Sequence, residues 1–192
     1  MSDIVESRPA RRRVAPFVAL AVALVIGALF VVLATSRGEP ADDVGVIDSP
    51  LLGRPAPTVR STTLGGEPFD LARRKGSWVV LNFFNSTCVP CRAEHPYLVD
   101  FAAAQGSSED PVELYTVVND DSDDAVRAYF EQNGGAWPKL RDDNGSIAIA
   151  FGVAKVPETW IVDPNGFVRL RIAGKLTEGL LEDQLSMLRG QS

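Results

Sequence analysis

The chain has 192 residues, of which 45% are hydrophobic, and its formal net charge is −6. This length and composition fit one compact domain with an additional segment. Residues 1–13 carry a net charge of +2 and residues 36–192 a net charge of −8. Nucleic-acid binding needs a basic surface that neutralises phosphates, so this acidic balance argues against a nucleic-acid partner.

The additional segment is an apolar run near the start of the chain. Residues 14–35 read VAPFVALAVALVIGALFVVLAT, 22 residues without a charge, and a helix of that length rises roughly 33 Å, enough to cross a bilayer core of ~30 Å. Arginines precede the run and acidic residues follow it, which predicts a cytoplasmic segment over 1–13. We expect a single-pass signal-anchor helix in the cell membrane with the rest of the chain outside the cytoplasm. A cleaved signal peptide and a buried soluble helix are the alternatives.

The part after this run divides into a tether and one domain. Residues 36–50 are rich in Gly, Pro, Ser and Asp, a composition that predicts a flexible linker. Residues 51–192 are long enough to form one hydrophobic core. Within residues 53–74, the stretch TVRSTTLGGEPFDL indicates a small β-hairpin at the front of this domain.

Strand and helix patterns then alternate along the domain. Residues 78–85, WVVLNFFN, form a continuous apolar run typical of a strand covered on both faces. Residues 91–105 have helical spacing, and Pro96 within them should kink or restart the helix. We expect the remaining elements to be a strand at 112–119, a helix capped by Ser122 and ending at Gly134, a short helix at 145–153, a hairpin at 158–174 and a helix at 177–190 capped by Thr177. This order predicts an α/β sheet with helices on both faces.

Residues 85–96, NSTCVPCRAEHP, contain both cysteines and the only histidine of the chain. A structural zinc site usually needs four ligands, more than this chain offers. A passive buried pair is a second alternative, because cysteines are often small core residues. The pair follows a strand and opens a helix in an exported domain, where conditions are oxidising. We therefore favour a redox-active dithiol, with neither metal nor cofactor.

The position of each cysteine predicts its role. Cys88 falls at the helix start, where unpaired backbone N–H groups favour a thiolate that attacks disulfides. Cys91, one turn on, can resolve the mixed disulfide formed on Cys88. Pro90 stiffens the loop between them, and the Val89-Pro90 dipeptide should tune the redox potential.

Further residues near the pair have two interpretations each. Glu94 is either a proton carrier for Cys91 or an ordinary solvated carboxylate. His95 is either a cation that stabilises a thiolate or simply an exposed side chain. Pro157, in GVAKVPETWIVD, reads by itself as a proline that starts a strand.

Taken together, GRPAP, VVLNFF, CVPCRAEHP, GVAKVPETWIVDPNGFV and the closing helix resemble the membrane-anchored, thioredoxin-like thiol:disulfide proteins of the TlpA/ResA/DsbE type. The resemblance covers nearly all of residues 51–190. It implies a thioredoxin-like fold, with a central mixed sheet, flanking helices and an N-terminal β extension. The strings CRAEH and PET resemble the sequences of the branch of this family that serves cytochrome c maturation.

The resemblance also implies roles for particular residues. Cys88 would be the exposed nucleophile and Cys91 the resolving thiol. Pro157 would be a cis-proline that presents the backbone of Val156 to the substrate, which Val89 and Pro90 would also contact. The remaining implied positions are acidic residues with auxiliary roles, Glu94 and Glu158.

The implied activity is reduction of the disulfide between the haem-binding cysteines of apocytochrome c, or of a cytochrome c assembly protein. The electrons would come from a transmembrane thiol carrier. Many relatives have Trp directly before the first cysteine, where this chain has Thr87, and this departure bears on the potential and the substrate groove.

Other functions fit parts of the same pattern. An oxidase or isomerase of secreted proteins would use the same chemistry in the opposite direction. A thiol peroxidase would share the fold, but peroxiredoxins carry Thr three residues before the reactive cysteine, where this chain has Asn85. A non-enzymatic module that binds apocytochrome or assembly partners would not need the cysteines at all.

Overall fold

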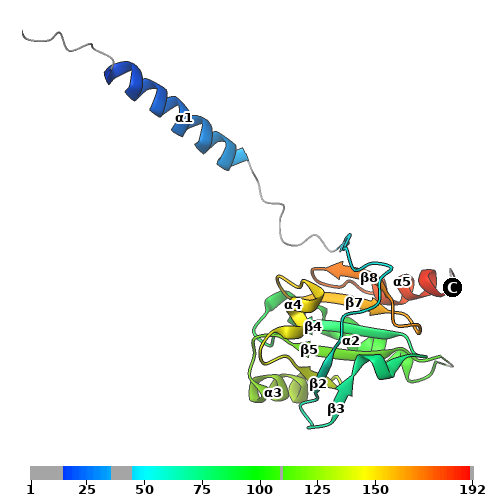
Figure 1. Cartoon of the computed structure of the whole chain (residues 1–192). Helices are drawn as coiled ribbons and strands as arrows, with labels where there is room; N and C mark the ends of the chain where they lie inside the picture. Colours follow the sequence, from blue (N-terminus) through cyan, green and yellow to red (C-terminus); the bar gives the residue numbers. More distant parts are fainter. Residues whose placement is uncertain (1–14, 36–44, 109, 191–192) are drawn as a thin grey trace, which may run out of the picture. The chain divides into compact units, whose positions relative to one another are not determined.

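The computed structural model describes residues 15–35, 45–108 and 110–190. The chain separates into two compact units, Met1–Ala41 and Asp42–Ser192 (Figure 1). The predicted cytoplasmic segment 1–13 lies outside the described residues, as does the greater part of the predicted tether.

The first unit contributes one described helix, α1 (Ala15–Thr35), which matches all but the first residue of the apolar run. Among the residues that the structure describes, no helix combines the length and the apolar character that crossing a membrane requires.

The second unit is built on a mixed six-stranded sheet with the order β1-β8-β7-β4-β5-β6. Its central strand β4 (Val79–Phe84) pairs with β5 in parallel and with β7 antiparallel. All six side chains of β4 are buried, which confirms the prediction of a strand covered on both faces. The other strands of the sheet are β1 (Gly45–Val46), β5 (Glu113–Val118), β6 (Lys139–Arg141), β7 (Glu158–Val162) and β8 (Val168–Ala173).

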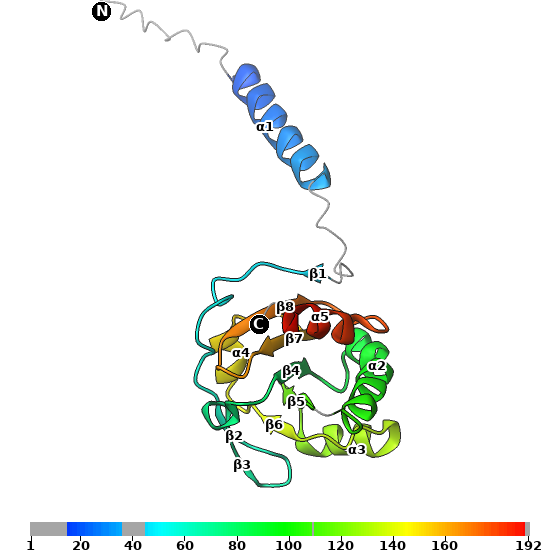
Figure 2. The ribbon, with the colours of Figure 1, turned by 90° about the vertical axis from the view of Figure 1, so that its right-hand side faces the viewer.

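Helices cover both faces of this sheet, as the alternating pattern predicts (Figure 2). One face packs against the apolar sides of α2 (Val89–Gln105), α3 (Asp123–Asn133) and α5 (Leu180–Arg189). The opposite face packs against α4 (Ser146–Phe151) and residues of the front segment. That segment contains the predicted hairpin, formed by β2 (Arg60–Thr62) and β3 (Pro68–Asp70), followed by the short helix η1 (Leu71–Arg74).

Two short strands depart from the sequence-based expectation. β1 forms the edge of the sheet and pairs with β8 through Gly45–Ala173 and Val46–Ile172, so the prediction that all of residues 36–50 form a flexible tether is wrong at these positions. β6 was not predicted, because only Leu140 of its three residues is buried. Its backbone pairing with β5 defines it as a strand, and apolar alternation is too short to reveal it.

The helix ends follow the sequence only in part. Ser122 caps α3, since its side-chain oxygen accepts a hydrogen bond from Ala125 N. The expected cap at Thr177 is wrong, because α5 begins after Gly179, whose left-handed φ of 74° turns the chain into the helix. The predicted restart at Pro96 does not occur, and α2 continues through this residue.

Replacing Ser122 and Thr177 in turn tests which of the two predicted N-caps stabilises its helix. Ser122→Ala should lower the free energy of unfolding by about 1 kcal/mol, because it removes a side-chain acceptor from the first turn of α3. Thr177→Ala, the matched control, should leave the stability within roughly 0.5 kcal/mol of the original protein. Urea unfolding followed by circular dichroism measures both, and equal losses would contradict the assignment.

Candidate active site

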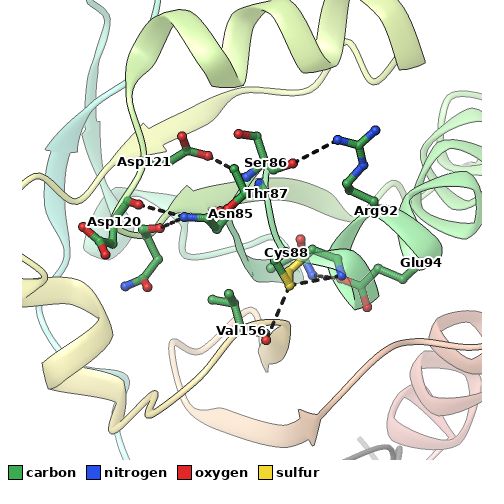
Figure 3. The surroundings of a disulfide bond; sticks show 12 residues. Asn85, Ser86, Thr87, Cys88, Arg92, Glu94, Asp120, Asp121 and Val156 are labelled. Carbon is green, nitrogen blue, oxygen red and sulfur yellow. Dashed lines mark hydrogen bonds between the residues drawn. A yellow bond between two sulfur atoms is a disulfide. The ribbon is translucent and has the colours of Figure 1, made fainter.

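The two cysteines lie where the chain leaves β4 and enters α2 (Figure 3). Cys88 is the N-cap of α2, and its sulfur accepts a hydrogen bond from the backbone N–H of Cys91 at 3.3 Å. A disulfide joins the two residues, whose Cα atoms are 5.3 Å apart. Pro90 fits the first turn because the N–H groups of that turn have no partner within the helix. One backbone donor of this first turn, the N–H of Cys91, therefore points at the sulfur of Cys88.

The two sulfurs differ in their access to a partner protein. Cys91 is completely buried, whereas Cys88 is half-buried. Val89 beside it is 76% exposed. A substrate can therefore reach Cys88 but not Cys91, which matches the roles of attacking and resolving thiol.

The loop before β7 lies against this disulfide. The carbonyl oxygen of Val156 is 3.6 Å from Cys88 Sγ, and the Val156-Pro157 peptide bond is cis, as the resemblance implies. Pro157 is buried and Val156 half-buried. The backbone of Val156 thus borders the sulfur that a substrate would approach.

Asn85 fixes the loop that contains Thr87. Its Nδ2 donates to the carbonyl oxygens of Asn119, at 3.1 Å, and Asp120, at 2.7 Å. Its Oδ1 accepts from the backbone N–H of Thr87 at 2.8 Å and from the Thr87 hydroxyl at 2.6 Å. Thr87 thus completes a local turn that the side chain of Asn85 closes.

A second hydrogen bond ties the same loop to the chain after β5. Asp121 Oδ2 accepts from the backbone N–H of Ser86 at 2.5 Å, and its Oδ1 accepts from the N–H of Ser122 at 2.8 Å. The approach to the disulfide is therefore held by polar contacts between two loops (Figure 3).

Glu94 lies one turn after Cys91 on the buried side of α2, with no exposed surface. Its Oε1 accepts from Asn82 Nδ2 at 2.8 Å, and its Oε2 accepts from the backbone N–H of Leu176 at 2.7 Å. Burial raises the pKa of Glu94 from 4.5 to about 7, although both hydrogen bonds and the charge of Lys175 oppose the rise. The interpretation as a solvated surface carboxylate is wrong.

The position of His95 does not fit the role of a cation that stabilises a thiolate. It is 3% exposed, and its Nε2 donates to the carbonyl oxygen of Gly134 at 3.1 Å. Its ring contacts those of Tyr129, Phe130 and Trp137 at centroid distances of 5.0, 5.0 and 5.7 Å. Desolvation lowers the pKa of His95, so the ring is a neutral part of the contact between α2 and α3. The expectation of an exposed side chain is therefore wrong.

Comparison with known proteins agrees with this geometry. The model of the AhpC/TSA family matches residues 52–171. Over 150 residues the chain is 36% identical to the thiol:disulfide interchange protein HelX of Rhodobacter capsulatus, covering 77% of this chain and 82% of HelX. The chain belongs to the AhpC/TSA family.

Other relatives place this AhpC/TSA-family protein among the thiol:disulfide oxidoreductases. It is 31% identical over 137 residues to the thiol-disulfide oxidoreductase ResA of Bacillus thuringiensis, covering 71% of this chain and 78% of ResA. The solved structure of DsbF from Mycobacterium tuberculosis superposes with a TM-score of 0.62 and 26% identity, covering 68% of this chain and 94% of DsbF. The resemblance to the TlpA/ResA/DsbE type is confirmed, and this protein is a thiol:disulfide oxidoreductase with a Cys88-Cys91 pair.

The structure does not bring the carboxylate of Glu158 to the cysteines of this oxidoreductase. Neighbouring residues of a strand point to opposite faces, and Glu158 shares its face with Trp160, on the side opposite Cys91. Arg171 binds the carboxylate through two hydrogen bonds, at 2.9 and 3.0 Å, and Trp160 Nε1 donates to it at 2.7 Å. The expected auxiliary role next to the cysteines does not fit this position, where Glu158 ties β7 to β8.

Sequence reasoning missed the polar partners of Glu94. Asn82 and Thr159 are completely buried, and Asn82 Nδ2 donates to Thr159 Oγ1 at 3.0 Å. The signal was present, because Asn82 is the one polar residue in the strand VVLNFF. A buried polar side chain in such a strand needs a partner, and that requirement pointed to a second buried polar group.

The raised pKa of Glu94 has a measurable effect on stability in the oxidised protein, where the cysteines do not titrate. The folded state holds the Glu94 proton more tightly than the unfolded chain, so the contribution is fully present below pH 4.5 and is lost as the pH rises through about 7. Glu94→Gln removes this dependence, and between pH 4.5 and 7.5 the original protein should lose ~3 kcal/mol relative to the variant.

Urea unfolding of both oxidised proteins across this pH range tests the difference. His95 acts in the opposite sense, because its lowered pKa destabilises the folded protein as the pH falls below 6.5. It is present in both proteins, so the comparison cancels its contribution. Parallel stability curves for the two proteins would show that Glu94 keeps its ordinary pKa.

Proposed function

We propose that this protein is a membrane-anchored, extracytoplasmic reductase of the disulfide between the haem-binding cysteines of apocytochrome c, or of an assembly protein that carries them. The main observation that supports this proposal is the arrangement of an accessible Cys88 in front of a buried Cys91 and a buried Glu94. Such an arrangement suits a substrate that is itself a protein disulfide, because only one sulfur at a time has to meet the partner. The similarity to HelX and ResA supports the same chemistry.

The first step uses the reduced dithiol. The Cys88 thiolate, favoured by the N–H groups at the start of α2, attacks one sulfur of the substrate disulfide. The substrate disulfide breaks, a mixed disulfide forms on Cys88, and the other substrate sulfur leaves as a thiolate that takes up a proton. The backbone of Val156 beside Cys88 offers a hydrogen-bonding edge to the substrate chain during this step.

The second step needs Cys91 to lose a proton where water has no access. Glu94 is one turn away on the same buried face of α2, and its pKa of about 7 lets it accept and release a proton near neutral pH. The resulting Cys91 thiolate attacks Cys88 Sγ, and the mixed disulfide breaks. The reduced substrate departs, and the Cys88-Cys91 disulfide remains with the two electrons transferred.

Renewed activity requires two electrons and two protons from a dithiol donor. The exported location that the sequence predicts is oxidising, so a transmembrane thiol carrier is the donor class that we propose. The charge-free run 14–35, preceded by arginines, supports an uncleaved anchor with a cytoplasmic N-terminus. Anchoring would keep Cys88 within reach of both the carrier and substrates that mature at the membrane.

The oxidase or isomerase alternative has one observation in its favour. The N-cap position of Cys88 stabilises its thiolate, and a stable thiolate makes the disulfide a stronger oxidant. The direction therefore depends on the redox potential of the pair. Equilibration with glutathione or dithiothreitol, followed by thiol alkylation and mass spectrometry, measures this quantity.

We predict a potential more negative than about −200 mV, in the range of reducing proteins. The isolated domain and the full chain in detergent should agree, because the potential is a property of the Cys88-Cys91 pair. A value near −120 mV, typical of a strong oxidant, would overturn the proposal that the protein is a reductase.

Trapping identifies the substrate. Cys91→Ala should hold the natural partner on Cys88 as a stable mixed disulfide that dithiothreitol releases, and mass spectrometry of the released protein should find peptides with paired haem-binding cysteines. Cys88→Ser with intact Cys91 is the control and should trap nothing, because Cys91 is buried. Partners that are general secreted proteins would favour the isomerase alternative. A double variant, Cys88→Ser with Cys91→Ser, that keeps the biological function would instead favour a binding module.

The contacts of Asn85 argue against the thiol peroxidase alternative. At the position of the peroxiredoxin threonine, Asn85 uses both ends of its side-chain amide within the loop contacts. Both hydrogens of the Asn85 side-chain amide are therefore engaged in the loop and do not serve a peroxide beside Cys88.

A further inference from the structure

A buried amide links the central strand to the carboxyl group of the active site. Asn82, in the middle of β4, has no exposed surface. Its Nδ2 donates to Glu94 Oε1 at 2.8 Å and to Thr159 Oγ1 at 3.0 Å. Thr159 is its register partner on β7. Asn82 therefore contacts both α2 and the strand that follows Pro157.

The hydrogen bonds of Glu94 in this structure suit its ionised form. Both carboxylate oxygens accept from N–H donors, one on Asn82 and one on the backbone of Leu176. A protonated carboxyl carries an O–H group that needs an acceptor. The backbone N–H of Leu176 cannot become one, so the proton has to sit on the oxygen that faces Asn82.

Asn82 can supply that acceptor without a change of side chain. Its Oδ1 is buried and has no hydrogen-bond partner among the residues that the structure describes. Rotating the amide by half a turn breaks the two hydrogen bonds of Nδ2, and it places Oδ1 where Nδ2 was. Oδ1 then accepts from the O–H of Glu94 and from the hydroxyl of Thr159, because a hydroxyl is both donor and acceptor. Two hydrogen bonds are present in either orientation.

We propose that Asn82 is a positioning residue that holds Glu94 beside Cys91 and serves both protonation states of its carboxyl group by turning its side-chain amide over. This proposal deepens the proposed function, because it rests on Glu94 as the proton carrier of Cys91. Thr159 supports the rotation from β7 as a hydroxyl that either donates or accepts.

No other titratable group near Glu94 in the described structure takes over this role of Asn82 as the hydrogen-bond partner of the carboxyl group. Lys175 precedes Leu176 in the loop after β8 and favours the ionised form of Glu94 by its charge. Tyr129 of α3 interacts electrostatically with Glu94, and Cys91 lies on the same helix as Glu94. None of these accepts the proton of a neutral Glu94 in a hydrogen bond that the structure shows. Asn82 is the partner in direct contact with the oxygen that takes the proton.

Nuclear magnetic resonance of the reduced protein tests the proposal directly. The side-chain carboxyl carbon of Glu94 and the side-chain amide of Asn82 are followed from pH 4 to pH 10. We expect the amide signals of Asn82 to change with the same midpoint as the carboxyl of Glu94. Amide signals that stay constant through the Glu94 titration would overturn the rotation.

Variants at the same place test the positioning. Asn82→Leu keeps the approximate volume but removes the partner of both protonation states. The hydrogen bond to the charged carboxylate is the stronger of the two, so the Glu94 midpoint should rise by about one pH unit or more. Thr159→Val should shift it in the same direction by less, because Asn82 remains. Thr116→Val is the matched control, since this buried hydroxyl of β5 accepts from Trp137 Nε1 at 2.8 Å, and it should leave the midpoint unchanged. An unchanged midpoint in Asn82→Leu would overturn the proposal.

A double-variant cycle separates positioning from a general loss of structure. The pH dependence of disulfide exchange with a small-molecule disulfide is measured for the original protein, Asn82→Leu, Glu94→Gln and the double variant. Asn82→Leu should shift the profile by about one pH unit or more in the presence of Glu94 but not in the Glu94→Gln background. An equal shift in both backgrounds would show that Asn82 acts through the structure alone.

A replacement variant and a comparison of two readouts allow the result to be interpreted in every case. If Asn82→Leu does not fold, Asn82→Asp keeps the shape and places a second carboxyl against Glu94, which should raise the Glu94 midpoint by at least as much through like charge. An unchanged midpoint in that variant would contradict the contact. If the carboxyl titration responds as expected while the exchange rate does not depend on Glu94, the proposed proton carrier fails and the positioning by Asn82 stands.

Discussion

A carboxyl group without access to water has to find its hydrogen bonds inside the protein, and the site of this oxidoreductase is organised around one such group. Glu94 receives one donor from β4 and one from the backbone between β8 and α5. Its own helix begins at the disulfide. A single buried side chain thus joins the central strand, the active-site helix and the C-terminal part of the domain.

The two ionisable neighbours Glu94 and His95 show how burial alone gives different chemistry. Both lie on the inner side of α2, and desolvation disfavours the charged form of each. The pKa of the carboxyl rises to about 7, where it can exchange protons, whereas the pKa of the imidazole falls and leaves it neutral. His95 is enclosed by aromatic rings, and Glu94 by amide donors. The surroundings decide which of the two adjacent side chains can exchange a proton near neutral pH.

Much of the fold and half of the site follow from local patterns. The apolar run of β4, the hairpin turn and the Ser122 cap are properties of neighbouring residues, and the N-cap position of Cys88 follows from the strand-to-helix junction. The pairing of β1 and β6, the burial of Glu94 and His95, and the direction of Glu158 depend on residues far away in the sequence. Helical spacing places Glu94 one turn from Cys91. Only the three-dimensional packing of α5 and the residues before it shows that this face of α2 is buried. Asn82 in an apolar strand was the one local sign of a buried polar network.

The short strand β1 gives the start of the domain a defined attachment to the sheet. Gly45 and Val46 pair with Ala173 and Ile172 at the end of β8. Ala173 is three residues before Leu176, whose N–H holds Glu94. The residues that pair with β1 are therefore only a few positions along the chain from the backbone donor of the buried carboxyl group.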